Sequence, residues 1–162
     1  MNTLKSLMSA TLIWAFTCVP AQAEDVRPAG AAVAIVVHPN APVDSLSIAQ
    51  LRRIFLAEQQ FWEDDSRITL LVRAPGAYER DLVLDQLYRM NEAQFRKYWI
   101  SKMFRAEVPS GPKLVFSNDM ALELVRAIPG SITYISAADL DGSVKVVAID
   151  GLRPDSADYP LR

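Results

Sequence analysis

The 162-residue sequence contains only one cysteine, Cys18, and only one histidine, His38. Because Cys18 lies in an N-terminal segment that we expect to be removed, the mature chain would have no disulfide and no cysteine-based zinc site. The motifs G-x-S-x-G, H-E-x-x-H and G-x-x-x-x-G-K-[ST] are also absent. No nucleophile, base and orienting group can therefore be assembled from the sequence, and we predict that the protein is not an enzyme and uses no cofactor.

The first residues have the features of a cleavable export signal. Lys5 supplies a positive charge, residues 7–19 are largely apolar, and Ala21-Gln22-Ala23 is a small-x-small cleavage site. A membrane anchor is the alternative, but the apolar run is shorter than the roughly 20 residues that span a bilayer, and Pro20 ends it. The sequence therefore predicts a signal peptide over residues 1–23, export from the cytoplasm, and no membrane insertion after cleavage.

Removing the signal leaves 139 residues, 162 less 23, which is the size of one domain. Residues 24–32 are rich in Ala, Pro and Gly and are predicted to be a linker, with the domain at 33–162. The loss of Lys5 changes the formal net charge from −2 to −3. This mild acidity argues against a nucleic-acid partner and leaves an anionic ligand possible, because backbone N–H groups bind anions whatever the net charge.

Segments typical of strands alternate with segments typical of helices. The uninterrupted apolar run at 33–37 indicates a strand that is buried on both faces. Asn91 followed by Gln94 resembles a capping box, which predicts a helix with Phe95, Tyr98, Trp99 and Phe104 on its buried side. The fold class is therefore α/β, with a mixed or mainly parallel sheet and helices on both faces. Further strands are predicted at 68–72, 114–116, 132–135 and 144–149, and the helices at 47–57, 82–90, 91–104 and 117–128.

The segment from Arg73 to Arg80 is the strongest candidate for a binding site. A predicted strand end, a turn at Gly76 and a helix start bring free N–H groups together, and the two arginines could add forked donors for an oxyanion. The alternative is that Arg80 pairs with Glu79 or Asp81 on a solvated helix face and that Arg73 lies on the surface. The spacing favours neither interpretation.

Other polar residues have simpler explanations. Ser117 and Ser131 stand at element ends that could face the same side of the sheet, although helix capping suffices for Ser117. His38 is interpreted as a turn residue rather than a general base. The carboxylates at 63–65 are interpreted as a solvated turn, since Ca²⁺ loops place ligands at alternate positions. No metal site is predicted.

Several stretches of the sequence, taken in order, match the motifs of one known family. They are Val36-Val37-His38-Pro39-Asn40-Ala41-Pro42-Val43, Leu46-Ser47-Ile48-Ala49-Gln50-Leu51-Arg52-Arg53-Ile54-Phe55, Arg73 to Arg80, Pro129-Gly130-Ser131-Ile132-Thr133-Tyr134-Ile135, Ile149-Asp150-Gly151-Leu152-Arg153-Pro154 and Tyr159-Pro160-Leu161. In these stretches the chain resembles the phosphate-binding subunit of bacterial ABC transporters, which has the type II periplasmic-binding-protein fold. Arg73 to Arg80 falls where that family has R-x-x-G-S-G-T-R, and Trp62 stands where a tryptophan usually follows the first helix.

The resemblance implies one lobe of a periplasmic solute-binding protein that binds phosphate or a similar oxyanion weakly. The chain keeps the two arginines and Gly76 of the motif but has Ala77, Tyr78 and Glu79 in place of its hydroxyl and glycine positions. A membrane transporter or a sensor protein would be the partner. A ligand-free envelope interaction or sensor module that has kept the fold is the alternative. The predicted ligand-binding residues are Arg73, Gly76, Ala77, Arg80, Ser117 and Ser131.

Overall fold

The computed structural model describes residues 31–162, so the predicted signal at 1–23 and nearly all of the predicted linker lie outside the described residues. The main strands are β1 (Val33–Val37), β3 (Thr69–Arg73), β4 (Lys113–Val115), β5 (Ser131–Ser136) and β6 (Lys145–Val146). They form a five-stranded sheet in the order β4-β3-β5-β1-β6. β3 is parallel to β4 and β5, whereas β1 is antiparallel to β5 and β6. The predicted mixed sheet is confirmed.

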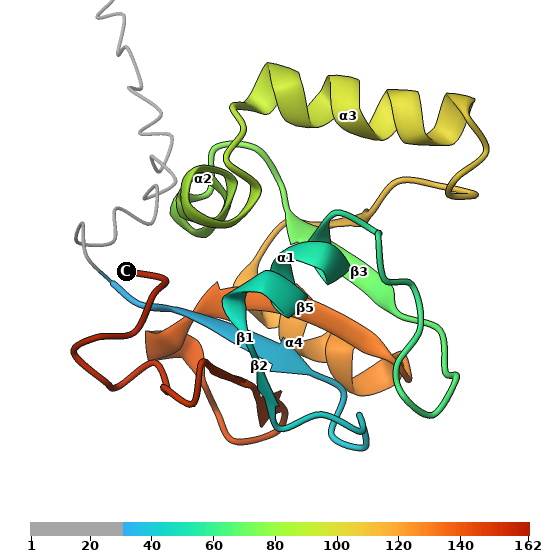
Figure 1. Ribbon diagram of the computed structural model, residues 1–162. Coiled ribbons are helices and arrows are strands. Elements are labelled where there is room, and N and C mark those ends of the chain that lie inside the picture. Colours follow the sequence, from blue (N-terminus) through green and yellow to red (C-terminus); the bar gives the residue numbers. More distant parts are fainter. Residues whose placement is uncertain (1–30) are drawn as a thin grey trace, which may run out of the picture.

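Helices cover both faces of this sheet (Figure 1). α4 packs on one face, and the remaining main helices pack on the other. This arrangement matches the predicted α/β class. The helices are α1 (Ile48–Phe55), α2 (Tyr78–Val83), the π-helix η1 (Leu84–Tyr88), α3 (Glu92–Phe104) and α4 (Asn118–Ala127).

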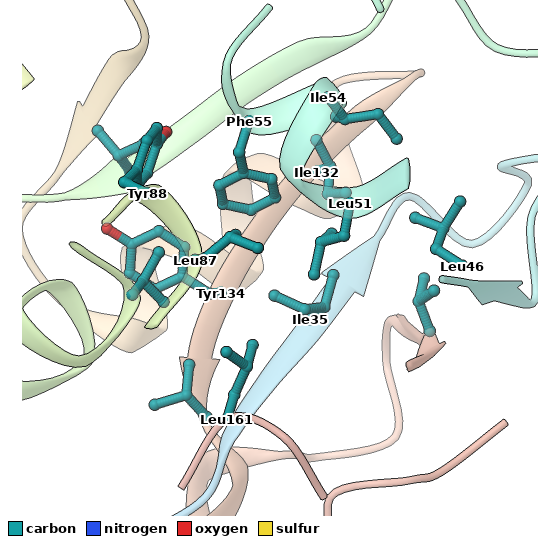
Figure 2. Close-up of a cluster of buried hydrophobic side chains, with 14 of the residues drawn as sticks. Ile35, Leu46, Leu51, Ile54, Phe55, Leu87, Tyr88, Ile132, Tyr134 and Leu161 are labelled. Atoms are coloured by element: carbon teal, nitrogen blue, oxygen red, sulfur yellow. The ribbon is translucent and has the colours of Figure 1, made fainter. Parts of the chain in front are cut away.

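The uninterrupted apolar sequence of β1 is explained by burial on both sides. Ile35 and its alternate neighbours face the core beneath α1 and η1, whereas Ala34 and Val36 face the core beneath α4. Figure 2 shows the larger core, in which Tyr134 from β5 and Tyr88 from η1 lie around Phe55 of α1. The predicted burial of this strand is therefore confirmed.

One of the two helix starts in this region is predicted correctly. The capping box of Asn91 and Gln94 is present at the start of α3, with both bonds at 2.9 Å. The helix predicted at 82–90 instead begins four residues earlier and changes to π geometry after Val83. Arg89, with a φ of 57°, ends it in the left-handed region. The spacing of apolar residues does not predict such a π segment.

The prediction that Phe104 is buried is wrong, because its side chain is 92% exposed. Phe104 lies nine residues, or about two and a half helical turns, after the buried Phe95, and therefore points to the opposite side of α3. The predicted strand at 144–149 is also divided in two. Its first part is β6, and its second part, β7 (Ala148–Ile149), pairs with β2 (Ser45–Leu46) in a separate small sheet. A 3-10 turn, η2 (Ala137–Asp139), follows β5.

Within the described residues, no helix combines the length and apolar character needed to cross a membrane.

Gly130, in the turn between α4 and β5, lies close to the backbone of Arg67. Its φ is +73°, and a Cβ atom added to it would lie 2.3 Å from the carbonyl oxygen of Arg67. Its own carbonyl accepts hydrogen bonds from Trp62 Nε1 at 3.0 Å and from Thr69 N at 3.1 Å.

We therefore expect Gly130→Ala to lower the free energy of unfolding by roughly 2–4 kcal/mol, because it adds a backbone clash to an unfavourable φ. Gly142→Ala is the matched control: its φ is +77° but no atom lies within 4 Å of the added Cβ. Gly142→Ala should lower the free energy of unfolding by only about 1 kcal/mol. Denaturant unfolding followed by circular dichroism would measure both, and equal losses would contradict the clash.

Candidate functional site at the carboxyl edge of the sheet

Parallel strands β3, β4 and β5 end at the same edge of the sheet and bring several polar residues together there. Arg73 is the last residue of β3, Asn118 begins α4 directly after β4, and Asp139 lies in the turn after β5. Gly76, with a φ of +89°, turns the chain into α2, and Glu79 lies in the first turn of that helix. This is the edge at which ligands collect in α/β domains.

Arg73 is held in place by its backbone and keeps unused donors on its side chain. Its N–H donates to the Tyr134 hydroxyl at 3.2 Å. Burial raises the pKa of Tyr134 above its ordinary value, so that hydroxyl stays protonated. The Arg73 side chain is 11% exposed, and its Nε and Nη1 atoms are buried without a hydrogen-bond acceptor. Its nearest counter-charge is the Glu79 carboxylate, whose Oε2 lies 3.8 Å from Nε.

Glu79 belongs to a buried network that sequence reasoning missed. Asn118 Nδ2 donates to Glu79 Oε1 at 2.8 Å and to Asp139 Oδ2 at 2.6 Å, so one amide group holds two carboxylates. Glu79 is only 3% exposed and Asn118 only 6%. The Asn118 Oδ1 atom is buried without a partner. The site therefore sets one arginine against two carboxylates, and Glu79 occupies one side of the Arg73 guanidinium.

The side chain of Arg80, a predicted ligand residue, is hydrogen-bonded to other groups of the protein. Its Nε and Nη2 donate to the two oxygens of Glu92, both at 2.9 Å, and its Nη1 donates to the Arg73 carbonyl at 2.6 Å. Its guanidinium lies 4.6 Å from the centre of the Phe95 ring. Burial is the largest single effect on the pKa of Arg80 and lowers it, but the hydrogen bond and charge of Glu92, together with the nearby tyrosines, raise the pKa above its ordinary value overall. Neither neighbour considered in the sequence, Glu79 or Asp81, is its partner.

The remaining predicted ligand residues are divided between the two ends of the sheet. Ser117 lies at the carboxyl edge and caps α4, where its Oγ accepts from Met120 N at 3.0 Å. Ser131 does not reach this site. It is paired with Thr69, four residues before Arg73, which puts it roughly 13 Å away along the strands. Its hydroxyl donates to the carbonyl of Val125. Ala77 precedes α2 and provides no side-chain cap.

The other polar candidates lie in turns. His38 Nδ1 accepts from Asn40 N at 3.1 Å. Asp64 accepts from the Ser66 hydroxyl and N–H, and these bonds lower the pKa of the exposed Asp64 carboxyl. Asp141 is bonded to Ser143 in the same way. Among residues 31–162 no group of three or more potential ligands could hold a metal ion.

Comparison with known proteins supports the resemblance seen in the motifs. The chain is 27% identical over 147 residues to the phosphate-binding protein PstS of Bacillus subtilis, across 85% of this chain and 44% of that protein. No family model matches it. A solved ABC-type phosphate transport receptor from Vibrio cholerae has a TM-score of 0.65 and 22% identity, over 81% of this chain and 53% of that chain.

PstS from Borrelia burgdorferi is similar in fold as well, with a TM-score of 0.63 and 19% identity, over 81% of this chain and 54% of that chain. This chain therefore spans about half the length of the proteins that it resembles. The predicted resemblance to the substrate-binding subunits of phosphate ABC transporters is confirmed, as is the periplasmic-binding-protein type of fold.

The bond between Arg80 and Glu92 ties α2 to the start of α3, so Glu92→Gln should destabilise the protein. The change leaves the buried Arg80 guanidinium with a neutral partner. We expect the free energy of unfolding to fall by roughly 1–3 kcal/mol, a range that allows for the partial exposure of Glu92. Glu123→Gln, on the exposed side of α4, is the matched control and should change stability by less than about 0.5 kcal/mol. Urea unfolding of both variants would measure these changes. Equal losses of stability would contradict a stabilising role for the bond between Arg80 and Glu92.

Proposed function

We propose that this chain is a non-catalytic, periplasmic solute-binding-type protein whose Arg73 site takes phosphate or a similar oxyanion weakly. The observation that carries the proposal is the buried Arg73 guanidinium, whose Nε and Nη1 have no hydrogen-bond acceptor. An oxyanion offers acceptors for such buried guanidinium donors. The likeness to phosphate-binding proteins supports the same ligand class.

Weak binding follows from the charges that surround Arg73. An incoming anion would meet Glu79, 3.8 Å from Arg73 Nε, and Asp139, which shares the Asn118 amide with Glu79. These two carboxylates repel the negative charge of the anion, so the anion must displace Glu79 from the guanidinium. The motif threonine of the resembling family is replaced by this glutamate, and the ligand therefore competes with a group of the protein itself.

The surroundings of the site add little to the affinity. Ala77 offers no hydroxyl at the start of α2, and the donors of Arg80 that face Glu92 are already used. The described residues form one lobe, so they include no second lobe that could close over the ligand and exclude water. Hydrogen bonds to an anion that water can reach gain much less than those in a closed cleft.

A ligand-free envelope interaction module is the second candidate, with a membrane transporter or a sensor protein as its partner. It is favoured by the Arg73–Glu79 contact, which supplies a counter-charge without any ligand. It is also favoured by large exposed apolar side chains, including Phe104 and Phe116 at 92% and 71% exposure. This candidate predicts a protein partner in a pull-down and no response to any anion.

Calorimetric titration with phosphate, sulfate and acetate tests the first candidate. We expect Glu79→Thr to bind phosphate at least tenfold more tightly than the unaltered chain, because it removes the competing charge and adds a hydroxyl. Arg73→Gln should abolish the heat. Arg53→Gln, an exposed arginine on α1, is the matched control and should bind as the unaltered chain does.

Arg73 is the better variant for this test, because Arg80 fixes α2 to α3 and its loss would also disturb the fold. The proposal fails if Glu79→Thr gains no affinity and Arg73→Gln loses none. If no anion gives heat with the unaltered chain or with Glu79→Thr, the interaction module becomes the better explanation.

A further inference from the structure

A cavity of about 200 Å³ lies at the other end of β3 from the Arg73 site. Helix α1, helix α3, the start of β3 and the loop before β4 surround it; Figure 1 shows how these elements are arranged. Thr69 lines the cavity and is four residues before Arg73, so the two sites are roughly 13 Å apart along the strand. The cavity is therefore separate from the site described above.

The inner wall of the cavity is apolar. It is formed by Ile54 of α1, Leu70 of β3, Trp99 of α3 and Val108 of the loop. A cavity of about 150 Å³ is enough to hold one benzene ring. This cavity therefore has the size for a single ring or a short branched aliphatic group.

The charged groups of the cavity are all of one sign. Arg67 and Lys113 line it, and its lining contains no carboxylate. Within residues 31–162, neither cation forms an ion pair, although the Arg67 guanidinium lies 5.9 Å from the Phe61 ring centre. Trp99 adds a buried indole N–H that has no acceptor. The cavity thus combines an apolar wall with two cations that lack an internal counter-charge.

We propose that this cavity is a second binding site, for a small organic carboxylate with an apolar body about the size of one ring. The apolar body lies against Ile54 and Leu70, and the carboxylate lies toward Arg67 and Lys113. A fully apolar ligand would leave these cations without a counter-charge, and inorganic phosphate would leave the apolar wall unfilled. The ligand class thus differs from that proposed for Arg73.

The test uses benzoate as the probe, with benzyl alcohol as its uncharged match and phosphate as the anion without an apolar body. Each is titrated to millimolar concentration into the ¹⁵N-labelled protein, and the indole N–H signal of Trp99 is followed, assigned with Trp99→Phe. We expect saturable shifts with benzoate, binding at least fivefold weaker with benzyl alcohol, and no shift with phosphate.

Paired variants separate this site from the other one. Arg67→Gln and Lys113→Gln, both at exposed residues, should together weaken benzoate binding at least fivefold and leave benzyl alcohol binding unchanged. Arg53→Gln and Arg73→Gln should leave benzoate binding unchanged. The inference is overturned if benzoate does not shift Trp99, if benzyl alcohol binds equally well, or if Arg73→Gln alone removes the response.

Discussion

Strands β1 and β5 are buried on both faces of the sheet, and this burial dictates where the helices and the candidate sites can lie. All residues of both strands are buried. Neither strand can meet water on either side, so helices must cover both faces of the sheet. Even the hydroxyls of β5 are bonded to the backbone: those of Ser131 and Thr133 donate to the carbonyls of Val125 and Leu71, at 3.1 and 3.0 Å. Once the faces are covered, only the edges and ends of the strands remain for ligands.

Much of the fold was predictable because its strongest signals are local. An unbroken apolar run gave β1, and the Asn91 capping box gave the start of α3. The errors arose where tertiary packing decides. Phe104 completes an aromatic pattern in the sequence but lies half a turn away from the buried side of α3, and the chain after β6 leaves one sheet to pair with β2 in another. Neither outcome is encoded within a short window of sequence.

The place of Arg73 in the fold was predictable, but the contacts around it were not. Arg73 was expected at the carboxyl edge because β3 precedes a glycine turn, and the structure puts it there. The partner of Arg80 was missed, since Glu92 is twelve residues away and is reached only after the π segment of η1. The Asn118 network was missed because its bonds join residues 39 and 21 positions apart. Ser131 was misplaced because it begins β5, whereas the site lies where β5 ends.

The two ends of β3 differ in how their charges are balanced, and this difference decides what each can bind. At Arg73 the counter-charge is the protein's own Glu79, so an anion can bind only by replacing it. At the other end Arg67 and Lys113 have no internal counter-charge, but both side chains are exposed. Ion pairs at exposed positions contribute only about 0–1 kcal/mol each.

The apolar wall of the cavity must therefore supply most of the affinity at this second site. Burying about 150 Å² of a ring at about 25 cal/mol per Å² contributes about 4 kcal/mol. The cations then select the charge of the ligand, while the wall selects its shape. At the carboxyl edge, by contrast, an anion must compete with Glu79 for Arg73.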